Sequence, residues 1–305
     1  MPAEKTDAII LRVVDFSETS CIVTLLTRDF GKITGIAKGA RRPKSPFEAA
    51  IDVLAICRIV FIPKTNAMSL LTEAKLEHRF RAGEANLSRL YVGYYVVELL
   101  RILTDEGDPQ PDVFELTTNM VRYLDTAHAN LEDLRFRLLQ FELGLLDLLG
   151  HLPMLTRCVN CGREKTTLSK VNFGLHSGGI LCHQCRRGQA NIVTISEAAF
   201  QVLLSLVGGQ IGADKQNSDN WNQPDRINEN RLKNRSWLPP QSTQKNNQEF
   251  KQPDEPDNGD LRSTAATETV VSASDEMVEV RRLVNQYITH LIGYPPRLHR
   301  FLQNL

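Results

Sequence analysis

Residues 6–39 read TDAIILRVVDFSETSCIVTLLTRDFGKITGIAKG, and this stretch decides the fold of the N-terminal part of the chain. Ile, Val, Leu and Thr dominate its three short runs, and polar residues separate each run from the next. Such a composition favours strands over a helix, and Gly31 suits a hairpin position that needs positive φ. Two more strands are predicted at 51–62 and 68–78. Short strands in this succession indicate a small closed or partly open barrel, such as an OB-fold.

Apolar residues follow a different period after residue 84, and their spacing of three to four predicts helices. The first predicted helix ends before Gly107, the second begins at Pro111, and the third ends at Gly150. A short helix over 198–209 is expected to stop at its two final glycines. Apolar stripes of this kind are typical of a helical core rather than of a cofactor pocket.

Four of the six cysteines form two CxxC pairs. A two-residue spacer lets both thiolates of a pair reach one metal, and two such pairs complete a tetrahedral site. The spacing therefore predicts one structural Zn²⁺, with the ligands Cys158, Cys161, Cys182 and Cys185. Redox-active pairs are the alternative, but neither pair follows a strand and opens a helix. Catalytic zinc is disfavoured because four cysteines leave no open ligand position.

Residues 210–275 interrupt the helical pattern. Sixteen of them are Asn or Gln, so we expect a disordered polar insert that buries too little apolar surface to offset its ordering entropy. The helical pattern returns afterwards, with Ser274 or Asp275 as a candidate cap. The predicted fold class is α+β and multidomain. It comprises an OB-fold barrel at 1–80, an α-helical domain at 84–209 and 276–305, and a zinc module within that domain at 157–187.

The chain contains 36 Lys and Arg and 36 Asp and Glu, so its formal net charge is zero. That total conceals a local excess, because residues 1–47 hold eight basic and five acidic side chains. Cations on one barrel face would neutralise phosphates and release counterions. The predicted DNA contacts are therefore Lys32, Lys38, Arg41, Arg42 and Lys44. A solvated loop without a ligand is the alternative.

A second basic cluster accompanies the cysteines, since residues 157–190 hold six basic side chains and one acidic. Arg186 and Arg187 could contact DNA or a partner, or they could offset the charge of the thiolates. Phe47 could stack on a base, but its position after Pro46 favours a role as a core anchor.

Several classes of protein are excluded by what the sequence lacks. No apolar stretch is long enough for a membrane span, and none resembles a signal peptide, so we expect a cytoplasmic protein. The chain contains no Walker loop, GxGxxG, HExxH or GxSxG motif, so we expect that it is not an enzyme. The acidic trio Asp105, Glu106 and Asp108 is interpreted as a solvated loop at a helix end.

These features together resemble the bacterial RecO family of recombination mediators. The resemblance covers most of the chain outside the insert, and its most specific part is GKITGIAKGARRPKSPF at 31–47. It also depends on the AIILRVVDFSETSCIVTLLTRDF that precedes this segment, on CxxC pairs placed after a helical stretch, and on IGYPPRLHRFL at 292–302. The polar insert at 210–275 departs from the family pattern.

The resemblance implies an OB-fold joined to a helical domain that carries a zinc module. It implies binding to single- and double-stranded DNA in the nucleoid, annealing of complementary strands, and loading of RecA together with RecR and RecF. It further implies that the acidic tail of single-stranded DNA-binding protein docks on the helical domain. Arg101, Arg122 and Arg135 are candidates for that contact by charge. The alternative function is a zinc-ribbon or transcription-type adaptor that binds proteins without annealing DNA.

Overall fold

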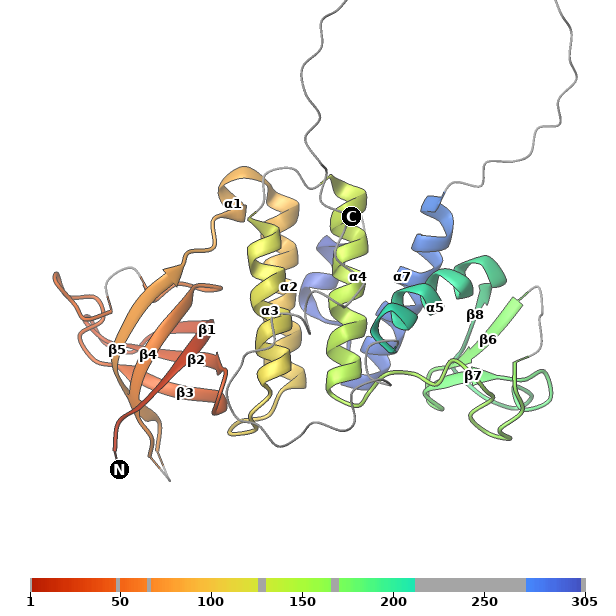
Figure 1. Cartoon of the computed structure of the whole chain (residues 1–305), viewed down its shortest axis with the longest axis horizontal. Coiled ribbons are helices and arrows are strands. Elements are labelled where there is room, and N and C mark those ends of the chain that lie inside the picture. The colour runs from red at the N-terminus through yellow and green to blue at the C-terminus, as the bar shows by residue number, and fades with distance from the viewer. Residues whose placement is uncertain are drawn as a thin grey trace, which may run out of the picture.

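A computed structural model describes residues 2–47, 50–64, 67–125, 130–165, 170–211 and 273–302. Figure 1 shows a five-stranded barrel at one end, helices in the middle and a three-stranded sheet at the other end. The predicted fold class is confirmed, with an OB-like barrel, then a helical region, and four cysteines that lie close together. The insert predicted at 210–275 lies almost wholly outside the described residues. Within the described part, no helix combines the length and apolar character needed to cross a membrane.

The barrel closes in the order β1-β2-β3-β5-β4, and all neighbours are antiparallel except β3 and β5. Its strands are β1 (Glu4–Asp15), β2 (Cys21–Thr27), β3 (Gly31–Ala37), β4 (Ile56–Ile62) and β5 (Ser69–His78). Apolar residues alternate into the interior, where Ile10, Val23 and Phe61 are buried. Phe47 is only 1% exposed and packs in the same cluster. Phe47 is therefore a core anchor and is not accessible to a DNA base.

The helical region begins directly after the barrel and resumes after residue 272. Its elements are α1 (Ala82–Ala85), α2 (Leu87–Leu103), α3 (Pro111–Leu124), α4 (Leu131–Leu148), α5 (Glu197–Ile211), α7 (Ala273–Ile292) and the 3₁₀ helix η2 (Arg297–Phe301). Side-chain oxygens of Asn86 and Asn130 cap α2 and α4 by accepting backbone N–H groups of the first turn. Gly150 follows α4 with φ of 74°, a left-handed conformation that ends a helix.

Two sequence-based boundaries were wrong. Helix α5 continues through Gly208 and Gly209 to Ile211 instead of stopping at the glycines. Glycine weakens a helix by about 1 kcal/mol per residue but keeps its backbone N–H, so it does not terminate a helix as proline does. Helix α7 begins at Ala273, so Ser274 and Asp275 lie in its first turn instead of preceding it as caps.

A second hydrophobic core, distinct from the barrel interior, joins the barrel to the helices. Ile9 and Leu26 of the barrel belong to the same cluster as Leu100 of α2 and Val284 of α7. The loop after α2 adds polar contacts, because Gly107 N donates to Lys32 O (2.9 Å) and Thr34 Oγ1 donates to Glu106 (3.1 Å). Asp105, Glu106 and Asp108 are exposed, as expected for a solvated loop, and the loop is also hydrogen-bonded to β3.

The segment after the insert is joined to the rest of the helical region by polar contacts as well as by this core. The buried carboxylate of Glu142 on α4 accepts from Arg281 of α7 and from Tyr95 of α2, the latter at 2.7 Å. Glu279 of α7 accepts the backbone N–H of Ser196 at 2.7 Å. Helix α7 thereby contacts both the long helices and the small sheet, whose strands are β6 (Lys170–Gly174), β7 (Gly179–Leu181) and β8 (Ile192–Ser196).

Candidate metal centre and nucleic-acid surface

The four cysteines of the two CxxC pairs converge in space. Cys158 and Cys161 lie at a turn in the segment between α4 and β6, while Cys182 and Cys185 lie in the turn after β7. Their four Sγ atoms all lie within 4.8 Å of one another, and those of Cys161 and Cys182 are 3.8 Å apart. Sulfurs at about 2.3 Å from a tetrahedral zinc would be separated by about 3.8 Å. The donor set therefore matches a four-sulfur metal site.

Backbone N–H groups around the cluster favour thiolates. The amides of Cys182 and Cys185 donate to Cys158 Sγ and Cys182 Sγ, both at 3.4 Å. Burial tends to raise the pKa of Cys158, but hydrogen bonds from backbone N–H groups outweigh it and lower the pKa to about 6. The thiol of Cys185 bonds to Cys182 and Cys161, which raises its pKa to about 12. A divalent metal held by all four sulfurs would require their deprotonation.

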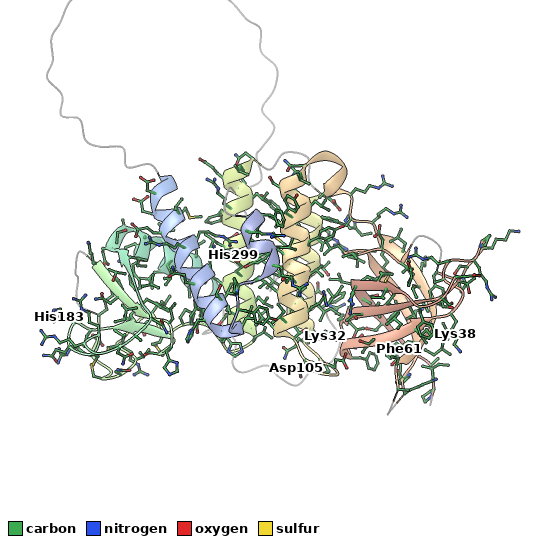
Figure 2. All side chains as sticks on the ribbon, turned by 180° about the vertical axis from the view of Figure 1, so that it is seen from behind. Lys32, Lys38, Phe61, Asp105, His183 and His299 are labelled. Carbon is green, nitrogen blue, oxygen red and sulfur yellow. The ribbon has the colours of Figure 1, made fainter. Side chains whose placement is uncertain are left out.

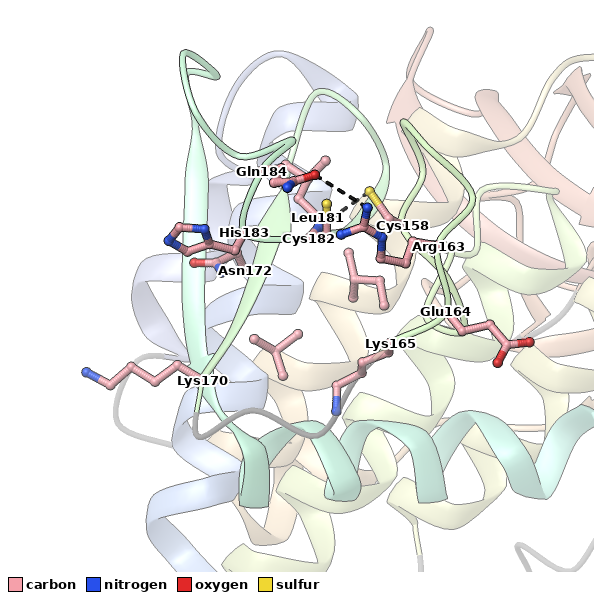
Figure 3. A pocket seen from close by; sticks show the side chains of 12 residues that line it. Cys158, Arg163, Glu164, Lys165, Lys170, Asn172, Leu181, Cys182, His183 and Gln184 are labelled. Atoms are coloured by element: carbon pink, nitrogen blue, oxygen red, sulfur yellow. Dashed lines mark hydrogen bonds between the residues drawn. The ribbon is translucent and has the colours of Figure 1, made fainter.

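A cavity of about 270 Å³ adjoins Cys158 and Cys182. Figure 3 shows the side chains that line it. Several cations line it, but Lys165 donates to both carboxylate oxygens of Glu197 at 2.7 Å and Arg163 donates to Gln184 at 3.4 Å. Lys165 and Arg163 therefore make contacts within the module, and their positive charges have a structural role there. Outside the cavity lining, Arg186 donates to Asn172 at 3.0 Å, while Arg187 is exposed.

Four of the five predicted DNA contacts lie in one exposed loop between β3 and β4, which we call the basic loop (residues 38–44). Lys38, Arg41, Arg42 and Lys44 are all exposed. The loop is fixed to the turn between β1 and β2, because Gly39 N donates to Ser20 Oγ (3.2 Å) and Arg41 N donates to Thr19 O (3.0 Å). The structure therefore presents these four cations on a supported edge of the barrel.

Lys32 does not belong to this group. Its ammonium donates to the carbonyls of Arg101 and Thr104 at the end of α2, the former at 2.9 Å. Burial lowers the pKa of Lys32, and the carboxylates of Glu106 and Asp105 oppose that shift. Figure 2 shows Lys32 near Asp105 beside the helices and Lys38 farther out on the barrel. In this structure Lys32 joins the barrel to the helices and does not contribute to the basic loop.

Sequence reasoning missed an exposed aromatic residue beside the basic loop. Phe16, in the turn after β1, is 59% exposed, and Val14 near the end of β1 is also exposed. From the sequence alone, Phe16-Ser17-Glu18 reads only as a turn between two strands. The available signal was an aromatic side chain at a turn position, where a polar residue is usual.

The three arginines considered for docking an acidic tail do not form one site. Arg101 is exposed at the end of α2, and Arg122 is exposed at the end of α3. Helices α2 and α3 are consecutive and lie side by side in opposite directions, so these two arginines are at opposite ends of the pair (Figure 1). Arg135, near the start of α4, lies at the same end as Arg122 and is only partly exposed.

The two candidate surfaces are far apart. Figure 2 labels Lys38 on the barrel and His183 beside the cysteines, and these lie at opposite ends of the molecule. An OB-type barrel, a helical region and a four-cysteine cluster together define a multidomain protein of the OB-fold class with a metal-type module.

Two family models match the chain: Recombination protein O N terminal over residues 1–80, and Recombination protein O C terminal over residues 84–226. The DNA repair protein RecO of Rhodopirellula baltica is 42% identical over 226 residues, which cover 71% of this chain and 81% of that protein. The DNA repair protein RecO of Symbiobacterium thermophilum is 31% identical over 212 residues, covering 69% of this chain and 82% of that protein. The chain therefore belongs to the RecO family, which assigns it a role in DNA repair.

Proposed function

We propose that the protein is a recombination mediator that binds single- and double-stranded DNA and anneals complementary strands. It acts without covalent chemistry, in the cytoplasm at the nucleoid, and helps RecR and RecF to load RecA. The observation that carries this proposal is the exposed basic loop at the supported edge of an OB-like barrel, in a chain of the RecO family. The DNA contacts we propose are Lys38, Arg41, Arg42 and Lys44. Lys32 instead joins the barrel to α2 through its hydrogen bond to Arg101 O.

Charge neutralisation is the proposed basis of annealing. Cations that contact phosphates release counterions and allow two strands to approach each other. Arg41 also pairs with Asp15 at 3.0 Å, but both side chains are largely exposed, so water and salt weaken this pair and phosphate can compete for the guanidinium. The loop therefore provides affinity without reading sequence.

We also propose that Cys158, Cys161, Cys182 and Cys185 hold one structural Zn²⁺. The metal, when bound, fixes the two CxxC turns to each other, and the chain's own backbone N–H groups stabilise the thiolates. The proposed domain division is a barrel at 1–80, a helical domain at 84–209 and 276–305 that contains the module at 157–187, and a polar insert at 210–275. The outermost residues of this insert, 210–211 and 273–275, belong to α5 and α7. The tail of single-stranded DNA-binding protein is proposed to dock on the helical domain.

The test is DNA binding by the double variant Arg41→Glu/Arg42→Glu, measured by fluorescence anisotropy with labelled oligonucleotides. The matched control is Lys75→Glu/Arg282→Glu, which changes the charge equally at two exposed positions on β5 and α7. We expect the basic-loop variant to bind more weakly and to reduce the salt slope by about 0.7 per lost contact on single strands. The control should retain both quantities.

Unchanged affinity of the basic-loop variant at about 50 mM salt would contradict the proposed surface, since phosphate contacts dominate at that ionic strength. A strand-annealing assay then separates the mediator from an adaptor. A metal-loaded protein that captures RecR but does not anneal complementary oligonucleotides would behave as an adaptor. Capture of RecR and single-stranded DNA-binding protein by the full chain, together with annealing, supports the mediator.

A further inference from the structure

An apolar stripe crosses the outer surface of the barrel next to the basic loop. Its members face each other across successive strands, as the pairs Val14–Ile22, Ile22–Ile36, Ile36–Leu70 and Leu70–Ile62. None of them is fully buried. Residues on the opposite face of the same strands, such as Val23 and Leu71, fill the barrel core. The stripe therefore faces outward, on the part of the barrel that the helices do not cover.

Phe16 extends this stripe beyond the end of β1. Its backbone N–H donates to Ser20 O at 2.9 Å, so the turn that carries it is closed by a hydrogen bond. The same turn receives the basic loop through Ser20 and Thr19. An exposed phenyl ring and four exposed cations thus lie on one supported unit. The turn also carries Asp15 and Glu18, and the first of these is paired with Arg41.

We infer that the outer barrel surface formed by Phe16 and the apolar stripe is a base-stacking site for single-stranded DNA. The inference rests on the proposed function, because it assumes that the basic loop contacts phosphates. Charge complementarity identifies the occupant, since an apolar stripe edged by cations suits a polyanion with exposed aromatic faces. A protein partner would cover the stripe without requiring the four cations.

On this inference, the surface binds single-stranded DNA and duplex DNA through different contacts. In a duplex the bases are already stacked on one another, so only the phosphates can contact the barrel. An unpaired base has a free π-face that can lie on Phe16, and such stacking contributes about 5- to 150-fold in affinity per base. The basic loop then serves both forms of DNA, while Phe16 serves the single strand.

The experiment compares Phe16→Ala, Phe16→Tyr and wild type, as the full chain, on a labelled dT oligonucleotide and on a duplex of equal length. Tyr294→Ala is the matched control, because Tyr294 is an exposed aromatic residue outside the barrel. We expect Phe16→Ala to weaken single-strand binding about tenfold, with an unchanged salt slope and duplex affinity within about twofold. Phe16→Tyr should bind like wild type, because tyrosine keeps the aromatic ring. Tyr294→Ala should also bind like wild type, because Tyr294 lies outside the barrel.

Two results for Phe16→Ala would overturn the inference. Single-strand affinity of Phe16→Ala within about twofold of wild type would show that the ring makes no contact. An equal loss on single strand and duplex would show that the substitution acts on the loop and not on a base. Failure of the proposed function looks different, because Arg41→Glu/Arg42→Glu would then leave binding to both forms of DNA unchanged. A wild-type protein that binds neither form would overturn both proposals.

Discussion

The ion pair between Glu142 and Arg281 offers a stringent test of how the segment after the insert is held. The Glu142 side chain is 0% exposed and that of Arg281 is 15% exposed, and they join α4 to α7. Arg281→Met keeps a long apolar stem but leaves a carboxylate buried without its cation. Removing one partner of a buried pair typically lowers the free energy of unfolding by about 3–5 kcal/mol. Tyr95 still donates to Glu142, which places the expected loss near the lower end, at about 3 kcal/mol.

The loss should depend on pH in a defined direction. Burial raises the pKa of Glu142 in the folded protein, and Arg281 opposes that shift. A carboxyl with a raised folded pKa contributes stability that is complete below its unfolded pKa and is lost as pH rises. Without Arg281 the folded pKa rises further, so the variant should be closest to wild type in acid. We expect the deficit at about pH 7.5 to shrink at about pH 5.

The assay is urea unfolding followed by circular dichroism at both pH values. Arg282→Met is the control, since Arg282 is exposed on the same helix and should change stability by less than about 0.5 kcal/mol. The double variant Glu142→Gln/Arg281→Met isolates Glu142 from His299, whose pKa is lowered by burial and then by Arg281. It should recover part of the loss and lose the pH dependence of the single variant. A deficit below about 1 kcal/mol, or one that is equal at both pH values, would refute the reasoning.

Three further outcomes follow from the structure. Cys158→Ser should lower thermal stability and the zinc content of the purified protein, and a chelator should destabilise wild type but not the variant; a fully stable chelated protein would contradict a structural metal. Phe47→Ala should cost about 3–5 kcal/mol in urea unfolding, because it empties a buried site in the barrel core; a loss below about 1 kcal/mol would contradict that packing. Gly31→Ala should cost at least about 1–2 kcal/mol in thermal unfolding, because Gly31 has φ of 67° and a Cβ there would meet the backbone of Asp108; an unchanged melting temperature would argue against that contact.

The strands of the barrel could be predicted because their signal is local. Each strand carries alternating or consecutive apolar residues, and turns such as that at Gly31 separate the strands. The cysteine cluster could also be predicted, since each two-residue spacer keeps the two cysteines of a pair close together. Both signals are contained within a few neighbouring residues.

The position of Lys32 could not be predicted, because its partners are the carbonyls of Arg101 and Thr104, about seventy positions away. Charge alone grouped it with the basic loop. Phe16 was missed for a related reason, since its exposure depends on which turn meets which loop in the closed barrel. A local sequence pattern predicts whether a segment forms a helix, a strand or a turn. The environments of Lys32 and Phe16 depend instead on contacts between segments that are distant in the sequence.

The hydrophobic core that joins the barrel to the small sheet has a mechanical consequence. If the barrel and the helical region were joined only by a flexible linker, DNA bound to the barrel could move relative to a partner bound to the helices. Here Ile9 of the barrel and Phe173 of the small sheet belong to one packed cluster, so the span between the two ends is set by the fold. The distance between the barrel and the small sheet is then fixed. The protein should favour assemblies in which DNA at one end and a protein partner at the other are separated by that distance. Dyes on β5 and β8 should accordingly keep a constant separation when DNA binds.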